Sequence, residues 1–392
     1  MDAAEQLRRI VQREGPVPFD RFVDVALYDE NSGFFGRGRG AGRAGGDFIT
    51  SPQVGSLFGR CVAGAFDQWW RALEQPDPFV VVEAGAGDGT LARDVRRAGP
   101  ACRDALHYVL VERSRALRDA QRERLEIEPP DEALGAFQRV AGEDHPIPAA
   151  GTGPLFTSLD EIPAVSFDGV VFANELLDNL PFGIAQFDGD RWQEVLVGVG
   201  RDGQFEELLV PAREPDVSRL ITCTEGATVN AGARLPIGRG IDEWFRQCGA
   251  ALRNGWCCVI DYAANARALL ARDGDWLRTY RGHGRGTEPL ADVGAQDITA
   301  EVMLEHVKAA ASGSSFRLVA ESSQVDWLRA LGIDDLVADG RAAWERGAAQ
   351  GGLDALAGRS MVNEGAALTD AGGLGAHRVL VVAHGSAWVE GR

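Results

Sequence analysis

An amide and two carboxylates follow an apolar run in the stretch DGVVFANELLDNLPF, residues 168–182. The run VVF is typical of a buried strand, so Asn174 and Glu175 stand at its carboxyl end and Asp178 lies one turn further. In open parallel sheets, ligands bind beyond the carboxyl ends of the strands. A carboxylate there can hold a cationic group or accept its proton, and an amide can orient a ligand. These three side chains are therefore candidate catalytic residues; the alternative is that Asn174 caps a turn and Asp178 is simply exposed.

The glycine-rich turn in VVVEAGAGDGTLARDV is the second chemical signal. Gly85, Gly87 and Gly89 follow an apolar strand and precede a helix. A dinucleotide fingerprint, GxGxxG, requires a glycine where Thr90 stands, so the turn fits poorly with a pyrophosphate on the helix start. It suits a ligand whose amino-acid part lies against the turn, with Glu83 placed to meet the ammonium group. S-adenosylmethionine (SAM) is such a ligand.

Glu112 ends the next apolar segment, HYVLVE. A carboxylate at the end of the second strand can accept hydrogen bonds from both ribose hydroxyls of an adenosine. NAD-dependent enzymes share this feature, so Glu112 indicates an adenosine but does not distinguish SAM from NAD. The alternative is that Glu112 only caps a strand and that Glu83 is a solvated acid at the edge of the sheet.

Five further residues are candidates for binding or catalysis. Asp47 and Thr50, in GDFITSP, precede a predicted helix whose amides could hold the methionine carboxylate of SAM. Ser158 and Leu159, after the third predicted strand, would flank the adenine. His283 lies between glycines in a polar segment that could form a lid, and it could act as a base near neutral pH. The alternatives are local capping for the first pair and a solvated imidazole for the histidine.

Strands and helices that alternate along the chain must position these residues. From residue 79 onward, short apolar segments are separated by helical ones, which is typical of a parallel sheet covered on both faces. We predict an α/β fold of the class I SAM-methyltransferase type, Rossmann-like, with a seven-stranded, mostly parallel sheet. The predicted strands are 79–84, 107–112, 137–142, 169–174, 256–262, 316–321 and 377–384.

Two insertions and an N-terminal extension surround this predicted core. Residues 1–75 are expected to be a helical region with a glycine-rich loop, and residues 76–392 to form the methyltransferase core. Within the insertion at about 183–240, residues 184–210 alternate polar and apolar side chains and contain Asp-Gly turns, which predicts antiparallel strands. The insertion at about 263–296 reads as a polar loop with little regular pattern.

Three helices are predicted in the N-terminal region. The start, MDAAEQLRRIVQREG, is amphipathic, and Phe19–Tyr28 has helical periodicity. The third is a long helix that Ser51 would cap and that Pro52 would open.

Composition and charge restrict the class of protein and its partners. The chain has 392 residues and a net charge of −18. This charge repels nucleic-acid backbones and would attract a cationic substrate; the alternative is that it only maintains solubility.

The six cysteines form no CxxC pair, so we expect buried thiols, a reducing cytoplasm and no metal site. No apolar run reaches the ~18 residues of a membrane span. Lys308 is the only lysine, and we interpret the dominance of arginine as the mark of a GC-rich bacterial genome.

With these motifs in view, the chain resembles the MidA-like SAM-dependent methyltransferases, the family of the mitochondrial complex I assembly methyltransferase. The matching blocks are FDRFVDVALYDENSGFF, GDFITSPQVGSLFGR, VVEAGAGDGTL, ANELLDNLPF, and YRGH with DVGAQDITAEV. They occur in the family's order and cover nearly the whole chain. Gln53 stands where the family commonly has an acid, and Ala86 and Asp88 stand where a proline and a longer polar residue are frequent.

The resemblance implies SAM as the methyl donor, bound by residues that include Gly85, Gly87 and Asp88. For the mitochondrial member it implies arginine side chains of a respiratory complex I subunit as acceptors. An arginine arrives as a cation, since its pKa is above about 12. Glu175 would then hold the guanidinium and take its proton, with Asp178 as the second choice.

We therefore expect a SAM-dependent methyltransferase that modifies an arginine of a protein substrate. One alternative is a small-molecule O- or N-methyltransferase of bacterial secondary metabolism. The other is a non-catalytic assembly partner that retains the fold. The sequence does not predict the oligomeric state.

Overall fold

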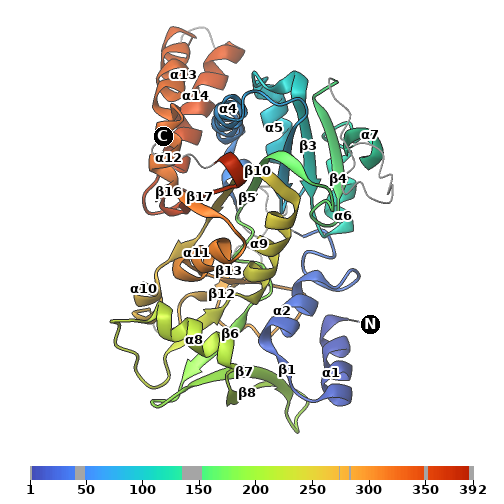
Figure 1. Ribbon diagram of the computed structural model, residues 1–392, viewed down its shortest axis with the longest axis vertical. Coiled ribbons are helices and arrows are strands. Elements are labelled where there is room, and N and C mark those ends of the chain that lie inside the picture. Colours follow the sequence, from blue (N-terminus) through green and yellow to red (C-terminus); the bar gives the residue numbers. More distant parts are fainter. Residues whose placement is uncertain are drawn as a thin grey trace.

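A seven-stranded sheet forms the centre of the upper half of the molecule in the computed structural model (Figure 1). The structure describes residues 2–39, 49–134, 152–272, 274–281, 284–347 and 352–387. The strand order is β16-β17-β10-β5-β2-β3-β4. The bounds are β2 Phe79–Ala84, β3 Leu106–Val111, β4 Leu155–Leu159, β5 Phe167–Asn174, β10 Leu252–Asp261, β16 Arg317–Ser323 and β17 Arg378–His384.

The sheet has the predicted class I arrangement. Strands β10, β5, β2, β3 and β4 are parallel, and β17 lies antiparallel between β10 and β16. The chain runs outward from β2 to β4, then returns to the centre, so β2 and β5 are neighbours although two strands separate them in sequence. This reversal of strand order is the topological switch point, where open α/β sheets bind ligands.

Six of the seven predicted strands coincide with strands of this sheet. The seventh, 137–142, lies outside the described residues. The structure instead has β4 at Leu155–Leu159, which the sequence pattern missed. This strand has five residues and is only partly buried at the sheet edge, so it lacks the long apolar run that marks the central strands.

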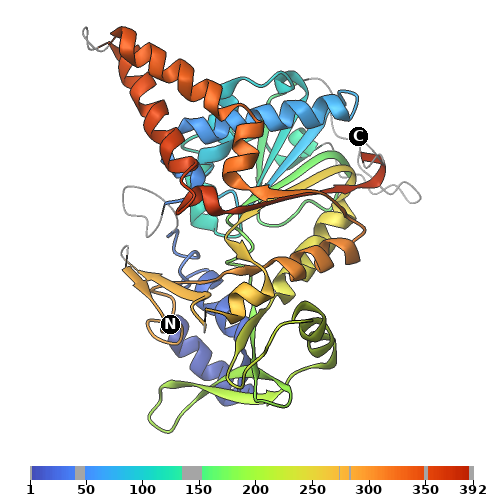
Figure 2. The same ribbon diagram turned by 90° about the vertical axis from the view of Figure 1, so that its left-hand side faces the viewer.

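Different helices cover the two faces of the sheet (Figure 2). Neighbouring residues of a strand point to opposite faces, as Cys257 and Cys258 do, and each thiol is buried in a separate core. One face packs against α4 Ser56–Ala72, α5 Thr90–Ala98, α12 Gln324–Ala330, α13 Ile333–Gly347 and α14 Leu353–Leu368. The other packs mainly against α9 Arg239–Ala251 and α11 Leu304–Gly313.

The helix predicted to begin at Ser51 is divided in two. Helix α3, Ser51–Val54, ends at Gly55, and α4 follows. The carboxylate of Glu364 accepts a hydrogen bond from the Leu57 amide, and a Cβ at Gly55 would collide with it. The predicted cap was wrong, because the Ser51 hydroxyl donates to the buried Gln324 side chain instead of an amide of its own helix.

A second sheet and the N-terminal helices form the lower half of the molecule in Figure 1. The inserted strands pair antiparallel, as predicted, and pack with α1 and α2 around a separate apolar core. The bounds are α1 Ala3–Glu14, β1 Val17–Pro18, α2 Phe19–Tyr28, β6 Gly183–Phe187, β7 Trp192–Val199, β8 Phe205–Pro211, α8 Glu214–Cys223 and β9 Arg234–Ile237.

The segment 263–296 is more regular than its sequence pattern indicated. Its strand β12, Leu277–Arg281, pairs with β13, Gly284–Gly286, and with β14, Asp297–Ala300, beside the helix α10, Ala266–Leu270. Trp276 is fully buried and anchors this small sheet to the lower core. The prediction of a loop was wrong because short strands with glycines give little periodicity.

The remaining elements are short. They are η1 Arg103–Ala105, α6 Arg115–Gln121, α7 Pro130–Leu134, β11 Ala263–Ala264, β15 Val302–Met303, η2 Leu374–Ala376 and η3 Gly385–Ala387. Across the described part of the chain, no helix combines the length and the apolar character needed to cross a membrane.

Candidate active site

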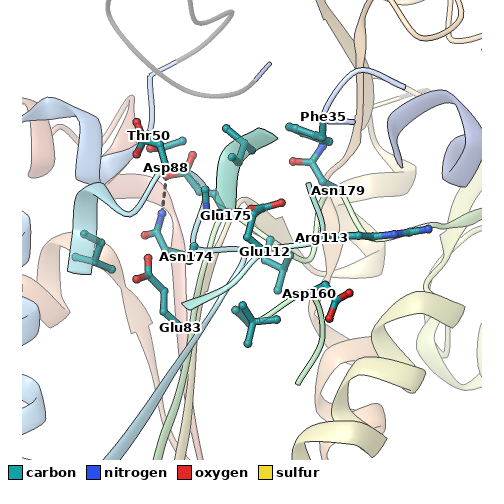
Figure 3. Close-up of a pocket in the computed structure, with 18 of the residues that line it drawn as sticks. Phe35, Thr50, Glu83, Asp88, Glu112, Arg113, Asp160, Asn174, Glu175 and Asn179 are labelled. Atoms are coloured by element: carbon teal, nitrogen blue, oxygen red, sulfur yellow. Dashed lines mark hydrogen bonds between the residues drawn. The ribbon is translucent and has the colours of Figure 1, made fainter. Parts of the chain in front are cut away.

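A cavity of about 900 Å³ lies over the carboxyl ends of β2, β3 and β5, at the switch point. It is lined by the glycine turn after β2, by Glu112 after β3 and by Asn174 and Glu175 at the end of β5 (Figure 3). The topology thus brings together residues that the sequence analysis derived from three separate motifs. The cavity is the candidate active site.

The glycine turn keeps its backbone exposed to this cavity. Gly85, Gly87 and Gly89 have φ angles of 73°, 53° and 79°, which disfavour other residues. The amides of Gly85 and Ala86 both donate to Val111 O of the neighbouring strand, which fixes the turn against β3. Apart from its two chain neighbours, no described residue has an atom within 4 Å of where a Gly87 Cβ would stand, so the space beside this glycine can take a ligand.

Glu83 is buried beneath the turn and lines the cavity. Tyr108 Oη donates to its Oε2 over 2.8 Å, but burial dominates and raises the pKa of Glu83 to about 8. A buried carboxyl of this kind becomes ionised when a cation arrives beside it. Its position therefore fits the ammonium group of SAM.

Glu112 is fixed by two backbone amides. Its Oε2 accepts from Gly87 N over 3.0 Å, and its Oε1 accepts from Ser114 N over 2.8 Å. Burial raises its pKa, and these two hydrogen bonds oppose that effect. Each carboxylate oxygen keeps a second lone pair, so the group can also accept from ribose hydroxyls.

Asp88 and Thr50 line the cavity, but other groups of the protein already bond to the Asp88 carboxylate. Asp88 accepts from the amide and hydroxyl of Thr90, and it pairs with Arg124 over 2.6 Å. Thr50 stands before α3, whose first amide, that of Ser51, donates to Glu175. Asp47 and His283 lie outside the described residues, so their predicted roles stay predictions.

Ser158 and Leu159, predicted to follow the strand 137–142, lie within β4, and neither lines the cavity. Ser158 Oγ donates to Gln121, and Leu159 O accepts from the Glu112 amide. The residues that reach the cavity are the next three, Asp160, Glu161 and Ile162, which sequence reasoning missed. An acidic pair directly after an apolar segment was the available signal, the same signal that identified Glu112.

Asn174 and Glu175 form one rigid unit at the end of β5. Glu175 has φ 53°, a strained conformation for a residue with a side chain, and its amide donates to Ile260 O over 2.8 Å. Its Oε1 accepts from Asn174 Nδ2 over 3.0 Å and from Ser51 N over 3.1 Å. Asn174 Oδ1 is buried without a hydrogen-bond partner among the described residues. Asn174 therefore orients the carboxylate, and Glu175 Oε2 is the acceptor left without a hydrogen bond from described residues.

Asp178 does not line the cavity but lies behind Glu175. It is only partly exposed: its Oδ2 accepts from Thr299 Oγ1 over 2.6 Å, and its Oδ1 is screened from solvent. Burial, with a smaller contribution from the charge of Glu175, raises its pKa to about 6. Its influence on the cavity is therefore electrostatic and passes through Glu175.

The structure also places His377 beside Glu175, which the sequence analysis did not anticipate. Its Nε2 lies 4.0 Å from Glu175 Oε2, and the residue is buried directly before β17. In sequence this histidine merely begins the apolar strand HRVLVVAH, so nothing local marked it. Only the position of β17 beside β10 brings it to the site.

The residues present fit SAM. The buried Glu83 suits its ammonium group, Glu112 suits its ribose, and the open backbone of the turn leaves room between them. In the part of the chain that the structure describes, no group of three or more His, Cys, Asp or Glu side chains could hold a metal ion.

A family model described as "Putative S-adenosyl-L-methionine-dependent methyltransferase" matches residues 61–320, which is more than half of the chain. The chain belongs to this family. The predicted fold, enzyme class and methyl donor are thereby confirmed, together with the resemblance stated from the sequence.

Individual relatives and structures agree with this family. The methyltransferase is 29% identical to the protein arginine methyltransferase NDUFAF7 homolog, mitochondrial, of Drosophila melanogaster over 78% of this chain and 69% of that protein. It is 25% identical to the human protein arginine methyltransferase NDUFAF7, mitochondrial, over 83% of this chain and 72% of that protein. A Burkholderia thailandensis crystal structure with bound S-adenosyl-homocysteine is 26% identical, with a TM-score of 0.78 over 97% of this chain and 92% of that one.

Proposed function

We propose that this SAM-dependent methyltransferase methylates an arginine side chain of a protein substrate. The observation that carries the proposal is the carboxylate of Glu175, held rigidly at the end of β5 with Oε2 free of hydrogen bonds from described residues. The names of the relatives, which are protein arginine methyltransferases, support the same acceptor.

The charge of the cavity favours a cationic acceptor. Of the described residues that line it, eight are acidic and three are arginines. The acids are Glu83, Asp88, Glu112, Glu123, Asp160, Glu161, Glu175 and Glu243, and the arginines are Arg39, Arg113 and Arg124. A guanidinium keeps its charge at any physiological pH, so it gains from this excess of carboxylates. A neutral acceptor would gain nothing from it.

The proposed reaction follows from the hydrogen-bonding capacity that remains free at Glu175. When bound, SAM supplies an electrophilic methyl group for an in-line displacement. Glu175 Oε1 already receives two hydrogen bonds, so Oε2 is the oxygen that would accept from the guanidinium. Asn174 Nδ2 donates to Oε1 and so would hold the carboxylate in position for the guanidinium. Glu175 would then take the proton that the nitrogen loses.

The substrate and the location can be proposed more narrowly. The resemblance to the complex I assembly methyltransferase supports a respiratory complex I subunit as the substrate. The single lysine and the absence of CxxC pairs support the cytoplasm of a bacterium as the location.

A small-molecule O- or N-methyltransferase is the second candidate, and the aromatic part of the cavity favours it. Tyr28 and Phe35 stack with ring centroids 5.5 Å apart, and both line the cavity with Trp244. The carboxylates beside them favour the arginine proposal instead. A non-catalytic assembly partner has less support, because the glycine turn, Glu83 and Glu112 are all in place to bind SAM.

Methyl-labelled SAM, incubated with the purified protein and a lysate of its host, separates these candidates. The products are divided into a protein fraction and a small-molecule fraction. The proposal predicts label in the protein fraction. Label confined to the small molecules would establish the second candidate in its place.

A further inference from the structure

His377 does not line the cavity but lies beside Glu175, which does. It lies between η2 and β17 and is buried. Its Nδ1 is 2.7 Å from Leu374 O, and a carbonyl only accepts, so Nδ1 carries a hydrogen. The other ring nitrogen, Nε2, is therefore the one that can gain or lose a proton, and it faces Glu175 Oε2 over 4.0 Å.

His377 stands beside Glu175, the proposed base, and is held in place by its neighbours. The Tyr262 ring packs against the imidazole in a T-shaped arrangement, with centroids 5.8 Å apart, and the amide of Gln324 donates to His377 O. The imidazole ring and the backbone of His377 are thus both held in place. A shift of about 1 Å would convert the 4.0 Å contact into a hydrogen bond, and such contacts are often long without substrate.

We propose that His377 is a positioning residue that acts through Glu175 and relays the proton released by the acceptor nitrogen. As the N–C bond forms and the donor's C–S bond breaks, the acceptor's N–H proton passes to Glu175 Oε2. Glu175 then gives that proton to His377 Nε2, and the imidazolium loses it to solvent before the next turnover. This inference rests on the proposed function, because it needs an acceptor that loses a proton.

Two further carboxylates lie near the pair. Asp178 interacts electrostatically with His377 and with Glu175, and the buried Asp261 interacts with both carboxylates. Other charged groups on the adjoining elements have partners of their own. Glu364 on α14 binds Leu57 N, Asp326 on α12 binds Ser323, and Arg378 on β17 pairs with Glu321.

Nuclear magnetic resonance of the His377 ring tests the pairing without any acceptor. The ¹⁵N chemical shift of His377 Nε2 is measured in the wild type and in Glu175→Gln. Loss of the carboxylate that faces Nε2 should move this resonance. An unchanged resonance would show that the two groups do not interact, and would overturn the relay whatever the substrate is.

Kinetics of His377→Gln test the relay itself. Without the imidazole, kcat should fall about 10- to 100-fold, with KM for both substrates within about twofold. The rise of kcat with pH should also flatten, whereas a merely structural defect would lower kcat equally at all pH values. The matched control is His384→Gln on the same strand, whose Nδ1 also faces a carbonyl, Arg253 O, away from the cavity.

The outcomes separate the two proposals. A wild-type protein that transfers no methyl group to arginine contradicts the proposed function. An active wild type with an equally active His377→Gln variant and an unchanged pH profile contradicts only the role of His377.

Discussion

Glu175 is the residue on which the acceptor assignment depends most. Replacing Glu175 by Gln keeps the shape of the side chain but removes the proton acceptor. We expect kcat to fall by on the order of 10²–10⁴, with SAM affinity unchanged, because the proposed donor-binding residues are Glu83 and Glu112. Initial rates with labelled SAM and titration calorimetry measure the two effects.

Glu126→Gln is the matched control, since Glu126 is exposed and lies outside the cavity. It should keep wild-type activity. Unchanged turnover in Glu175→Gln would remove Glu175 from the catalytic assignment.

We expect Glu83, as the proposed partner of the SAM ammonium group, to link SAM binding to proton release. Burial raises its pKa to about 8, so the carboxyl is mostly protonated near neutral pH when no ligand is bound. An ammonium group beside it favours the charged form and lowers this pKa, so the proton must leave on binding. At pH 7 we expect release of up to about one proton per SAM bound.

Calorimetry in buffers of different ionisation enthalpy measures that release. In Glu83→Gln the group cannot titrate, and the buffer dependence should largely disappear. A wild-type enthalpy that is independent of buffer would show that Glu83 is not the ammonium partner.

The sequence predicted cavity-lining residues best where a long apolar strand ends in an acidic residue. Glu83, Glu112 and Glu175 each follow an apolar strand directly, and the ends of parallel strands meet at one edge. His377 could not be found in this way, because it starts the antiparallel strand β17 and meets Glu175 only through the strand order. The residues around Asp160 were missed because a weak edge strand hid the turn that carries them.

At the scale of elements, the short helix α3 carries the amide that holds Glu175. Ser51 Oγ fixes this helix to Gln324, and both side chains are fully buried. Ser51→Ala would leave Gln324 Oε1 without a donor. We expect a loss of about 1–3 kcal/mol in the free energy of unfolding, measured by urea denaturation.

Ser218→Ala provides the comparison, because Ser218 is exposed and bonds only locally to Glu214. Its effect should stay within about 0.5 kcal/mol. Equal stability of the two variants would show that the buried bond does not anchor α3.

The elements that the sequence predicted well are those with long, uniform patterns. Central strands such as β2 and β10 have apolar runs because both of their faces are covered. The break at Gly55 could not be predicted, since it depends on the distant Glu364, and the strands β12 to β14 are too short to show a period. Tertiary contacts decide both features.

At the scale of the whole molecule, the net charge of −18 should accelerate the encounter with a cationic substrate. Raising ionic strength from roughly 0.01 M to roughly 0.15 M shortens the screening length from about 30 Å to about 8 Å. For an arginine substrate we expect kcat/KM to fall roughly threefold to tenfold over this range. A kcat/KM that does not change with salt would argue for a neutral acceptor.

Identification of the methylated amino acid tests the central claim most directly. Substrate protein labelled by the wild type and by Glu175→Gln is hydrolysed to amino acids, and the methylated products are separated by mass. Methylarginine should form with the wild type and be absent with the variant. Label on any other side chain, or methylarginine in equal amount with the variant, would contradict the assignment of this site to arginine.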